Sequence, residues 1–167
     1  MQYAARQVTE RKLNKIGVHV LDLGGRDVNG TTRPLFPGAD RYVSVDIAEG
    51  RGVDIVCDAA ELDLRDRFDV VMSTELLEHA ERGAEIVATA FKHLKPGGWF
   101  VATMAGPGRK PHSADGSHVM SPWEFYRNVS RELLDSWLVA AGFEWREIDE
   151  THMDMRCVAQ RPEVSDD

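Results

Sequence analysis

The stretch Val20-Leu21-Asp22-Leu23-Gly24-Gly25 decides the fold of this chain. Its apolar part has the length and composition of a short strand, and it runs directly into two glycines. Glycines at the end of a strand leave the backbone free of side chains, so a ligand can approach it closely. Open α/β sheets bind their ligands at this carboxyl edge. We therefore expect a strand that ends in a ligand-binding loop.

Short apolar runs rich in Val and Ile recur along the chain and read as further strands. They cover residues 41–46, 53–57, 68–73 and 99–104. Several are apolar on both faces, as a parallel sheet covered on both sides requires. Helical spacing of apolar residues occurs over 86–94, with a stop at Lys95-Pro96-Gly97-Gly98, and over 134–141, with a stop at Gly142. This alternation predicts the α/β class.

The two ends of the chain extend this pattern. Residues 143–148 and 155–160 read as two strands, and the connection between them is too short for a crossover helix, so we expect them to be antiparallel. Residues 4–15 read as a polar helix, expected on the surface or over a ligand. Together these features predict a mostly parallel sheet with an antiparallel C-terminal strand and helices on both faces.

Two segments break the alternation. Residues 26–40 contain two glycines and two prolines, so at most a short helix fits in the crossover that they form. Residues 106–128 form a long irregular stretch that is also rich in glycine and proline. Long loops inside compact domains are usually functional or mobile. We expect residues 106–129 to be the loop that contacts the substrate.

The length and composition suit one domain, since 167 residues with 43% hydrophobic content can bury a sizeable core. We predict a single domain over 1–167 that ends in a flexible tail over 162–167. No apolar run approaches the roughly 20 residues that span a bilayer. The polar first residues lack the apolar stretch of a secretory signal. The sequence therefore predicts a cytoplasmic protein with no membrane partner.

Charge and cysteine content narrow the partners further. The formal net charge of −8 makes duplex nucleic acid an unfavourable partner, because affinity for a phosphate backbone comes largely from Lys and Arg. A local basic patch around Arg109 and Lys110 stays open, and composition does not set the oligomeric state. Cys57 and Cys157 lie in predicted strands, and two thiols make no disulfide framework, so we expect both to be reduced and buried.

The nature of the ligand follows from the loop chemistry. Asp46 ends the next strand, at about the spacing where dinucleotide folds place an acidic residue against a ribose hydroxyl. The segment Gly24-Gly25-Arg26-Asp27-Val28 lacks the G-x-G-x-x-G spacing that meets a pyrophosphate. S-adenosylmethionine has no phosphate and carries a cationic ammonium and sulfonium, which suit a loop containing Asp22. We therefore predict S-adenosylmethionine as the cofactor.

Several stretches resemble the broad class I, Rossmann-like family of S-adenosylmethionine-dependent methyltransferases, and the resemblance runs from about residue 18 to residue 160. They are Val20-Leu21-Asp22-Leu23-Gly24-Gly25, Val45-Asp46, Cys57-Asp58-Ala59, Phe68-Asp69-Val70-Val71, Glu75-Leu76-Leu77-Glu78-His79, Leu94-Lys95-Pro96-Gly97-Gly98 and Ala141-Gly142-Phe143. The resemblance implies a Rossmann-like sheet and methyl transfer to an oxygen, nitrogen or carbon atom. This chain departs from the family at Arg26 and Val28, where a Gly-x-Gly-x-Gly pattern is frequent.

The resemblance also implies roles for individual residues. The methionine part of the cofactor is expected against Asp22, Gly24 and Gly25, and the ribose hydroxyls against Asp46. The adenine is expected against Asp58 and Ala59, and the floor beside the methyl group at Ser73, Thr74 and Glu75. Their neighbours Arg26 and Ile47 complete the predicted cofactor site.

Candidate catalytic residues follow the fourth predicted strand. Glu78-His79 lies where a side chain could reach the methyl group or the acceptor, and Glu75 belongs to the same stretch. A histidine ordinarily titrates near neutral pH, as a general base should, so we expect His79 and Glu75 to be catalytic. A histidine held by local hydrogen bonds at a helix start explains His79 equally well. Methyl transfer is a displacement from a cationic leaving group, so alignment can supply much of the acceleration without a base.

The long loop carries further candidates. We predict that His112, His118 and Arg127 contact the acceptor, with a solvated loop as the alternative, and that Trp123 and Phe125 anchor the loop to the core. His112 and His118 with Asp115 between them do not have the spacing of a zinc site, so no metal is expected.

Three functions remain at this stage. The first is a methyltransferase acting on a small-molecule acceptor, with peptide or RNA as further acceptors. The sequence lacks the Asn-Pro-Pro-aromatic, Asp-Pro-Pro-aromatic and Pro-Cys motifs of DNA base methylation. The second is a catalytically silent S-adenosylmethionine-binding or interaction module. The third is an NAD-dependent oxidoreductase, which the missing pyrophosphate loop disfavours.

Overall fold

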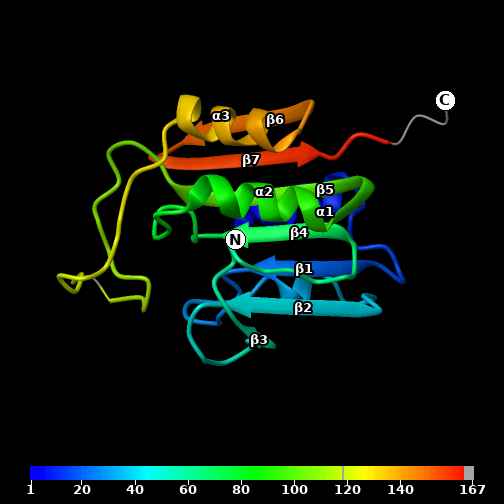
Figure 1. Cartoon of the computed structure of the whole chain (residues 1–167), viewed down its shortest axis with the longest axis horizontal. Helices are drawn as coiled ribbons and strands as arrows, with labels where there is room; N and C mark the ends of the chain where they lie inside the picture. Colours follow the sequence, from blue (N-terminus) through cyan, green and yellow to red (C-terminus); the bar gives the residue numbers. More distant parts are fainter. Residues whose placement is uncertain (118, 164–167) are drawn as a thin grey trace.

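A seven-stranded sheet forms the centre of the molecule, with the strand order β3-β2-β1-β4-β5-β7-β6 (Figure 1). The computed structural model describes residues 1–117 and 119–163. The parallel strands are β1 (His19–Leu23), β2 (Arg41–Asp46), β3 (Ile55–Val56), β4 (Phe68–Thr74) and β5 (Leu94–Ala105). β7 (Asp154–Gln160) runs antiparallel to both β5 and β6 (Trp145–Thr151). The predicted α/β, Rossmann-like class and its antiparallel C-terminal strand are confirmed.

Helices cover both faces of this sheet, as predicted. α1 (Gln2–Glu10) lies on one face, and α2 (Gly83–His93) and α3 (Arg131–Ala141) lie together on the other (Figure 1). The alternation of side chains along a strand divides the core between the two faces. In β1, Leu21 and Leu23 belong to the core beneath α2 and α3, whereas Val20 belongs to the core beneath α1.

The position of the N-terminal helix differs from the prediction. Although its sequence is polar, α1 buries Tyr3, Ala4, Gln7 and Val8. These residues share one side of the helix and pack on the sheet, where the apolar members contact the core around Val101. The expectation of a surface position was therefore wrong, because a narrow apolar stripe is enough to dock a short helix.

Two segment boundaries also follow from local backbone chemistry. The crossover 26–40 holds only a 3₁₀ helix over Arg33–Leu35, as expected. α2 ends at His93, as the predicted stop at Lys95-Pro96-Gly97-Gly98 requires, and these four residues already belong to β5, because Leu94 pairs with Phe68 of β4. Gly97 has a φ of 73°, which glycine adopts readily, and its amide donates to the carbonyl of Arg161 at 3.1 Å.

The two cysteines are free thiols, as predicted. Cys157 is buried in β7, whereas Cys57 is only half-buried just after β3, near the other edge of the sheet. Among the described residues, no helix has the length and apolar character needed to cross a membrane. Residues 164–167 of the predicted flexible tail lie outside the described residues.

The two faces of α3 give a direct test of the packing. Leu138 is fully buried, whereas its neighbour Val139 is 53% exposed. We expect Leu138→Ala to lower the free energy of unfolding by about 2–5 kcal/mol, because it leaves a cavity in the core. Val139→Ala, the matched control, should change it by less than about 0.5 kcal/mol. Urea denaturation measures both, and equal losses would contradict the orientation of α3.

Candidate functional site

A cleft of about 970 Å³ lies at the carboxyl ends of β1, β2 and β4. The long loop 106–129 projects from this edge of the sheet (Figure 1). Loop residues between Arg109 and Ser117 line one side of the cleft. We call this space the carboxyl-edge cleft. Predicted site residues that line it are Asp22, Gly24, Gly25, Arg26, Asp46, Ile47, Thr74, Glu75, His79 and His112.

The two glycines after β1 have no room for side chains. Gly24 has a φ of 75°, and a Cβ atom there would lie 2.9 Å from Leu76 Cβ. At Gly25 a Cβ atom would lie 2.3 Å from Ser44 Oγ and 3.0 Å from Asp22 Cγ. The amides of both glycines donate to the carbonyl of Val45, at 2.8 and 3.1 Å. The loop is therefore held flat against β2 and exposes bare backbone to the cleft.

Asp22 is a buried carboxylate with one oxygen unused. Its Oδ2 accepts hydrogen bonds from the Thr32 hydroxyl at 2.9 Å and the Tyr42 hydroxyl at 2.5 Å. Its Oδ1 is buried and has no hydrogen-bond partner within the described part of the chain. Burial raises the pKa of Asp22 to about 6, although its hydrogen bonds and Arg33 act in the opposite direction. Such an oxygen at the cleft suits a cationic donor.

Asp46 is held at the end of β2 by backbone amides. Its Oδ1 accepts from the amide of Ala48 at 3.0 Å, and its Oδ2 accepts from the amide of Arg26 at 3.3 Å. The Arg26 side chain continues across the cleft and donates to the carbonyl of Ala114 at 3.2 Å. The residue that replaces a usual family glycine therefore ties the glycine loop to the long loop.

Glu75 follows β4 in a left-handed conformation with a φ of 56°, which non-glycine residues seldom adopt outside functional sites. Its amide donates to the carbonyl of Thr103 at 2.7 Å, and its Oε1 accepts from the Thr103 hydroxyl at 3.0 Å. Its Oε2 forms an ion pair with Arg109 at 2.7 Å, and Arg109 also pairs with Asp154 at 2.9 Å. These contacts aim a carboxylate into the cleft.

Comparison with known families decides what kind of protein has this cleft. Residues 1–148 match the family described as "Methyltransferase domain". The chain belongs to this methyltransferase family. The predicted family membership is thus confirmed, and the protein is a methyltransferase. No curated protein sequence matches the chain.

Solved structures share the fold of this methyltransferase. A putative methyltransferase from Bacillus halodurans C-125 matches with a TM-score of 0.70 at 16% identity, covering 96% of this chain and 99% of that one. An S-adenosylmethionine-dependent methyltransferase from Mesorhizobium loti matches at 0.68 and 18%, covering 96% and 99%. The 1,6-didemethyltoxoflavin-N1-methyltransferase of Burkholderia thailandensis matches at 0.68 and 19%, covering 96% and 77%. At these identities the likeness shows the fold.

Two histidines lie together on the side of the cleft formed by the long loop. The rings of His79 and His112 are 5.0 Å apart between centroids, and Tyr126 packs edge-on against both. Burial, together with His112, lowers the pKa of His79 to about 4, so His79 is neutral at neutral pH. Beside it, burial and the nearby Glu75 raise the pKa of Glu78 well above the ordinary range.

Several predicted site residues are not among the residues that line the cleft of the methyltransferase. Asp58 accepts from Arg82 at 3.2 Å and from the amide of Ala60, Ala59 is buried, and the Ser73 hydroxyl is enclosed beneath the strand ends. The Arg127 guanidinium lies over the rings of Phe125 and Trp137. His118 lies outside the described residues. Their predicted roles stay predictions.

Three residues that shape this site carry no local signal in the sequence, because they act through contacts between distant segments. They are Thr32, Tyr42 and Arg109. Glu78, which the sequence places with His79 after the fourth strand, accepts from the amide of Ala105 at the end of β5. One packing prediction was wrong, since Trp123, expected to anchor the long loop, is 84% exposed.

The raised pKa of Asp22 predicts a pH dependence of stability. Its ordinary pKa is 3.8, and the folded protein raises it to about 6. Between these values the folded state keeps a proton that the unfolded state has lost. The resulting stabilisation is complete below about pH 4 and lost as the pH rises through about 6, and it amounts to about 3 kcal/mol.

We therefore expect the difference in free energy of unfolding between the wild-type protein and Asp22→Asn to fall steadily from pH 4 to pH 7. Urea denaturation across that range measures it. Asp66→Asn is the matched control, since Asp66 forms only an exposed ion pair with Arg41. If the difference in free energy of unfolding changed as little with pH for Asp22→Asn as for the control, the fold would not raise the pKa of Asp22.

Proposed function

We propose that this methyltransferase binds S-adenosylmethionine in the carboxyl-edge cleft and transfers the methyl group to a small-molecule acceptor. The observation that carries the proposal is Asp22 in the lining of the cleft: its Oδ1 is buried without a hydrogen-bond partner among the described residues, and its carboxylate group lies against the backbone of Gly25. The cofactor carries an ammonium group, and such a cation would complete the hydrogen bonding of Asp22. A pyrophosphate would instead add negative charge beside this carboxylate.

The arrangement of the strand ends supports a position for each part of the cofactor. The methionine part would lie against Asp22, Gly24 and Gly25, and the ribose hydroxyls against Asp46 with Ile47 beside them. Arg26 would keep the glycine loop in place through Asp46 and the long loop.

The adenine would lie towards Asp58 and Ala59, which follow β3, the neighbour of β2 in the sheet. Ser73, Thr74 and Glu75, at the end of β4, would form the floor beside the methyl group. The Glu75 carboxylate, although shared with Arg109, would favour the sulfonium cation over a neutral group.

The acceptor would enter between β4 and the long loop 106–129. His79 and His112 line this part of the cleft. The proposal keeps the predicted acceptor contacts of Arg127 and of His118, the latter outside the described residues. The enclosed volume of about 970 Å³ suits a cofactor with a small acceptor. The methyltransferase of Burkholderia thailandensis, which shares the fold, was crystallised with 1,6-didemethyltoxoflavin and S-adenosylhomocysteine.

The protein would act on this reaction chiefly by alignment. When bound, the cofactor would supply a methyl group on a cationic sulfur, and the sulfur would leave with the electron pair of the carbon–sulfur bond as an electron pair of the acceptor forms the new bond to carbon. Glycine backbone on one side and the long loop on the other would fix the two reactants in line. His79, neutral at neutral pH, can accept a hydrogen bond from the acceptor.

We extend the proposal to the whole chain. Residues 1–167 would form one domain that folds around this cleft. A cytoplasmic location is supported by the two free thiols, which lie near opposite edges of the sheet and so do not pair in this fold.

Cofactor binding tests the proposal directly. Calorimetry should show that one S-adenosylmethionine binds per chain, while NADH shows no binding. Asp46→Asn should weaken binding about 10- to 100-fold, because it removes a charged hydrogen-bond acceptor. Asp66→Asn is the matched control and should keep the wild-type affinity. Asp66 precedes the start of β4, at the end of that strand opposite the cleft.

Either of two results would refute the proposal: no heat of binding at millimolar S-adenosylmethionine, or wild-type affinity for S-adenosylmethionine in Asp46→Asn. Formation of S-adenosylhomocysteine with a panel of hydroxyl, amine and carbon acceptors then measures turnover. Binding without turnover on every acceptor would favour the catalytically silent module instead.

A further inference from the structure

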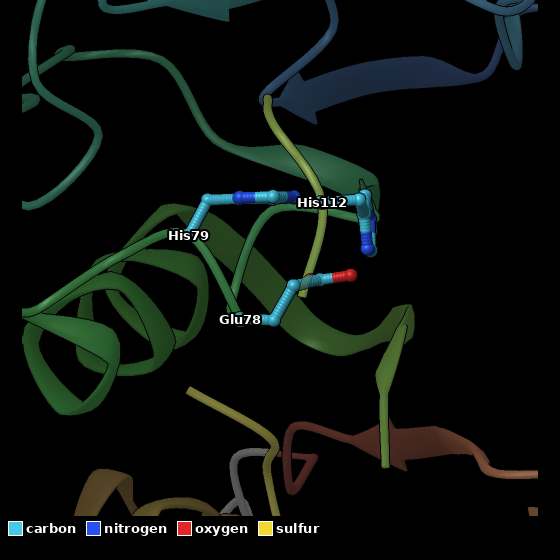
Figure 2. A group of neighbouring side chains, drawn as sticks. All are labelled: Glu78, His79 and His112. Carbon is cyan, nitrogen blue, oxygen red and sulfur yellow. The ribbon is translucent and has the colours of Figure 1, made fainter. Parts of the chain in front are cut away.

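Three side chains with metal-binding atoms converge beside the carboxyl-edge cleft. Glu78 and His79 lie in the turn after β4, and His112 comes from the long loop more than thirty residues later in the sequence. One potential ligand atom from each residue lies within 4.8 Å of the other two. Figure 2 shows the carboxyl end of Glu78 and the ring of His79 both directed towards His112.

Glu78 provides an independent sign that this space is built for a ligand. The residue is completely buried, and its Oε1 accepts from the amide of Ala105 at 3.0 Å. Its Oε2 is also buried, yet it has no hydrogen-bond partner within the described part of the chain. A buried carboxylate oxygen without a partner is costly and uncommon in folded proteins. A cation at this position would satisfy it.

The histidines add two nitrogen donors to this oxygen. The Nδ1–H of His112 donates to the carbonyl of Lys110 at 3.2 Å, so Nε2 is the ring nitrogen left to bind a metal. Nδ1 of His79 is buried without a partner among the described residues, like Oε2 of Glu78. The backbone of the turn is fixed as well, since the carbonyl of Glu78 accepts from the amide of Arg127 at 2.8 Å.

We propose that Glu78, His79 and His112 form a binding site for a divalent transition-metal ion of the zinc class. Two imidazoles and one carboxylate are a donor set that zinc and similar ions prefer, whereas magnesium and calcium favour oxygen ligands alone. Metal–ligand bonds of about 2.0–2.2 Å place the ligand atoms about 3–4 Å apart. The side chains therefore need to close in only slightly.

Charges around the three residues leave the site available to a cation. Arg109 is the nearby positive charge, but its guanidinium is held between Glu75 at 2.7 Å and Asp154 at 2.9 Å. It is therefore neutralised by two carboxylates and does not occupy the free oxygen of Glu78. The prediction of no metal rests on the spacing of the loop residues His112, Asp115 and His118 alone. The fold instead brings His112 to Glu78 and His79.

A role for the metal rests on the proposed function. Three protein ligands leave coordination positions open, and His79 and His112 line the carboxyl-edge cleft on the side proposed for the acceptor. The open positions would take an oxygen atom of the acceptor and fix its orientation towards the methyl group. The two histidines then act on the acceptor through the ion rather than by direct contact.

Metal titration of the full chain tests this inference. After treatment with a chelator and dialysis, the protein should bind one Zn²⁺ by calorimetry, and Co²⁺ should give visible absorption bands of a low-symmetry site. His112→Ala and Glu78→Gln should each weaken Zn²⁺ binding by at least about tenfold, because each removes a ligand. His19→Gln, at the opposite end of β1, is the matched control and should bind Zn²⁺ like the wild type.

Two outcomes would overturn the inference: no stoichiometric Zn²⁺ binding by the folded wild-type protein, or unchanged affinity in His112→Ala. His112 lies in a half-exposed loop, so this variant stays informative if Glu78→Gln fails to fold. S-adenosylmethionine binding is measured on the same wild-type sample. Cofactor binding without Zn²⁺ binding refutes only the metal site, and Zn²⁺ binding without cofactor binding refutes only the proposed function.

Discussion

The attachment of the turn after β4 to the end of β5 is the interaction on which the site depends. The amide of Glu75 donates to the carbonyl of Thr103, and the carboxylate of Glu78 accepts from the amide of Ala105. These bonds continue the β4–β5 pairing beyond the end of β4, along the last residues of β5. They hold Glu75 in its left-handed conformation and bring His79 to face the long loop. A turn free of these bonds would present neither side chain to the cleft.

The same attachment joins the two halves of the cleft. The glycine loop packs against Leu76 of this turn, so its backbone is shaped by the residues that also carry Glu75 and His79. On the side of the cleft formed by the long loop, Arg109 pairs with Glu75, and the amide of Arg127 donates to the carbonyl of Glu78. Polar contacts with this turn therefore help to position the long loop, together with those that Arg26 and Asp154 make to Ala114 and Arg109.

The sequence specified the strands more fully than the site. Apolar runs bounded by glycine and aspartate marked β1, β2 and β4 closely, because strand formation depends on local pattern. α1 was misplaced because its buried stripe is narrow within a polar sequence. The strand-end residues Gly24, Gly25 and Asp46 could be predicted to meet at one edge. Pairs such as Glu75 with Arg109 could not, because their partners come from loops whose paths no periodicity describes.

Within the described residues, two buried carboxylate oxygens have no hydrogen-bond partner: Oδ1 of Asp22 and Oε2 of Glu78. Each lowers the stability of the ligand-free protein, because a buried anion or its forced protonation is unfavourable. Core positions are ordinarily filled by apolar or fully hydrogen-bonded groups, and departures from that rule are expected at functional sites. The ligands proposed above would satisfy both oxygens, an organic cation at Asp22 and a metal ion at Glu78. Ligand binding and folding stability are then linked, since each ligand stabilises only the folded state.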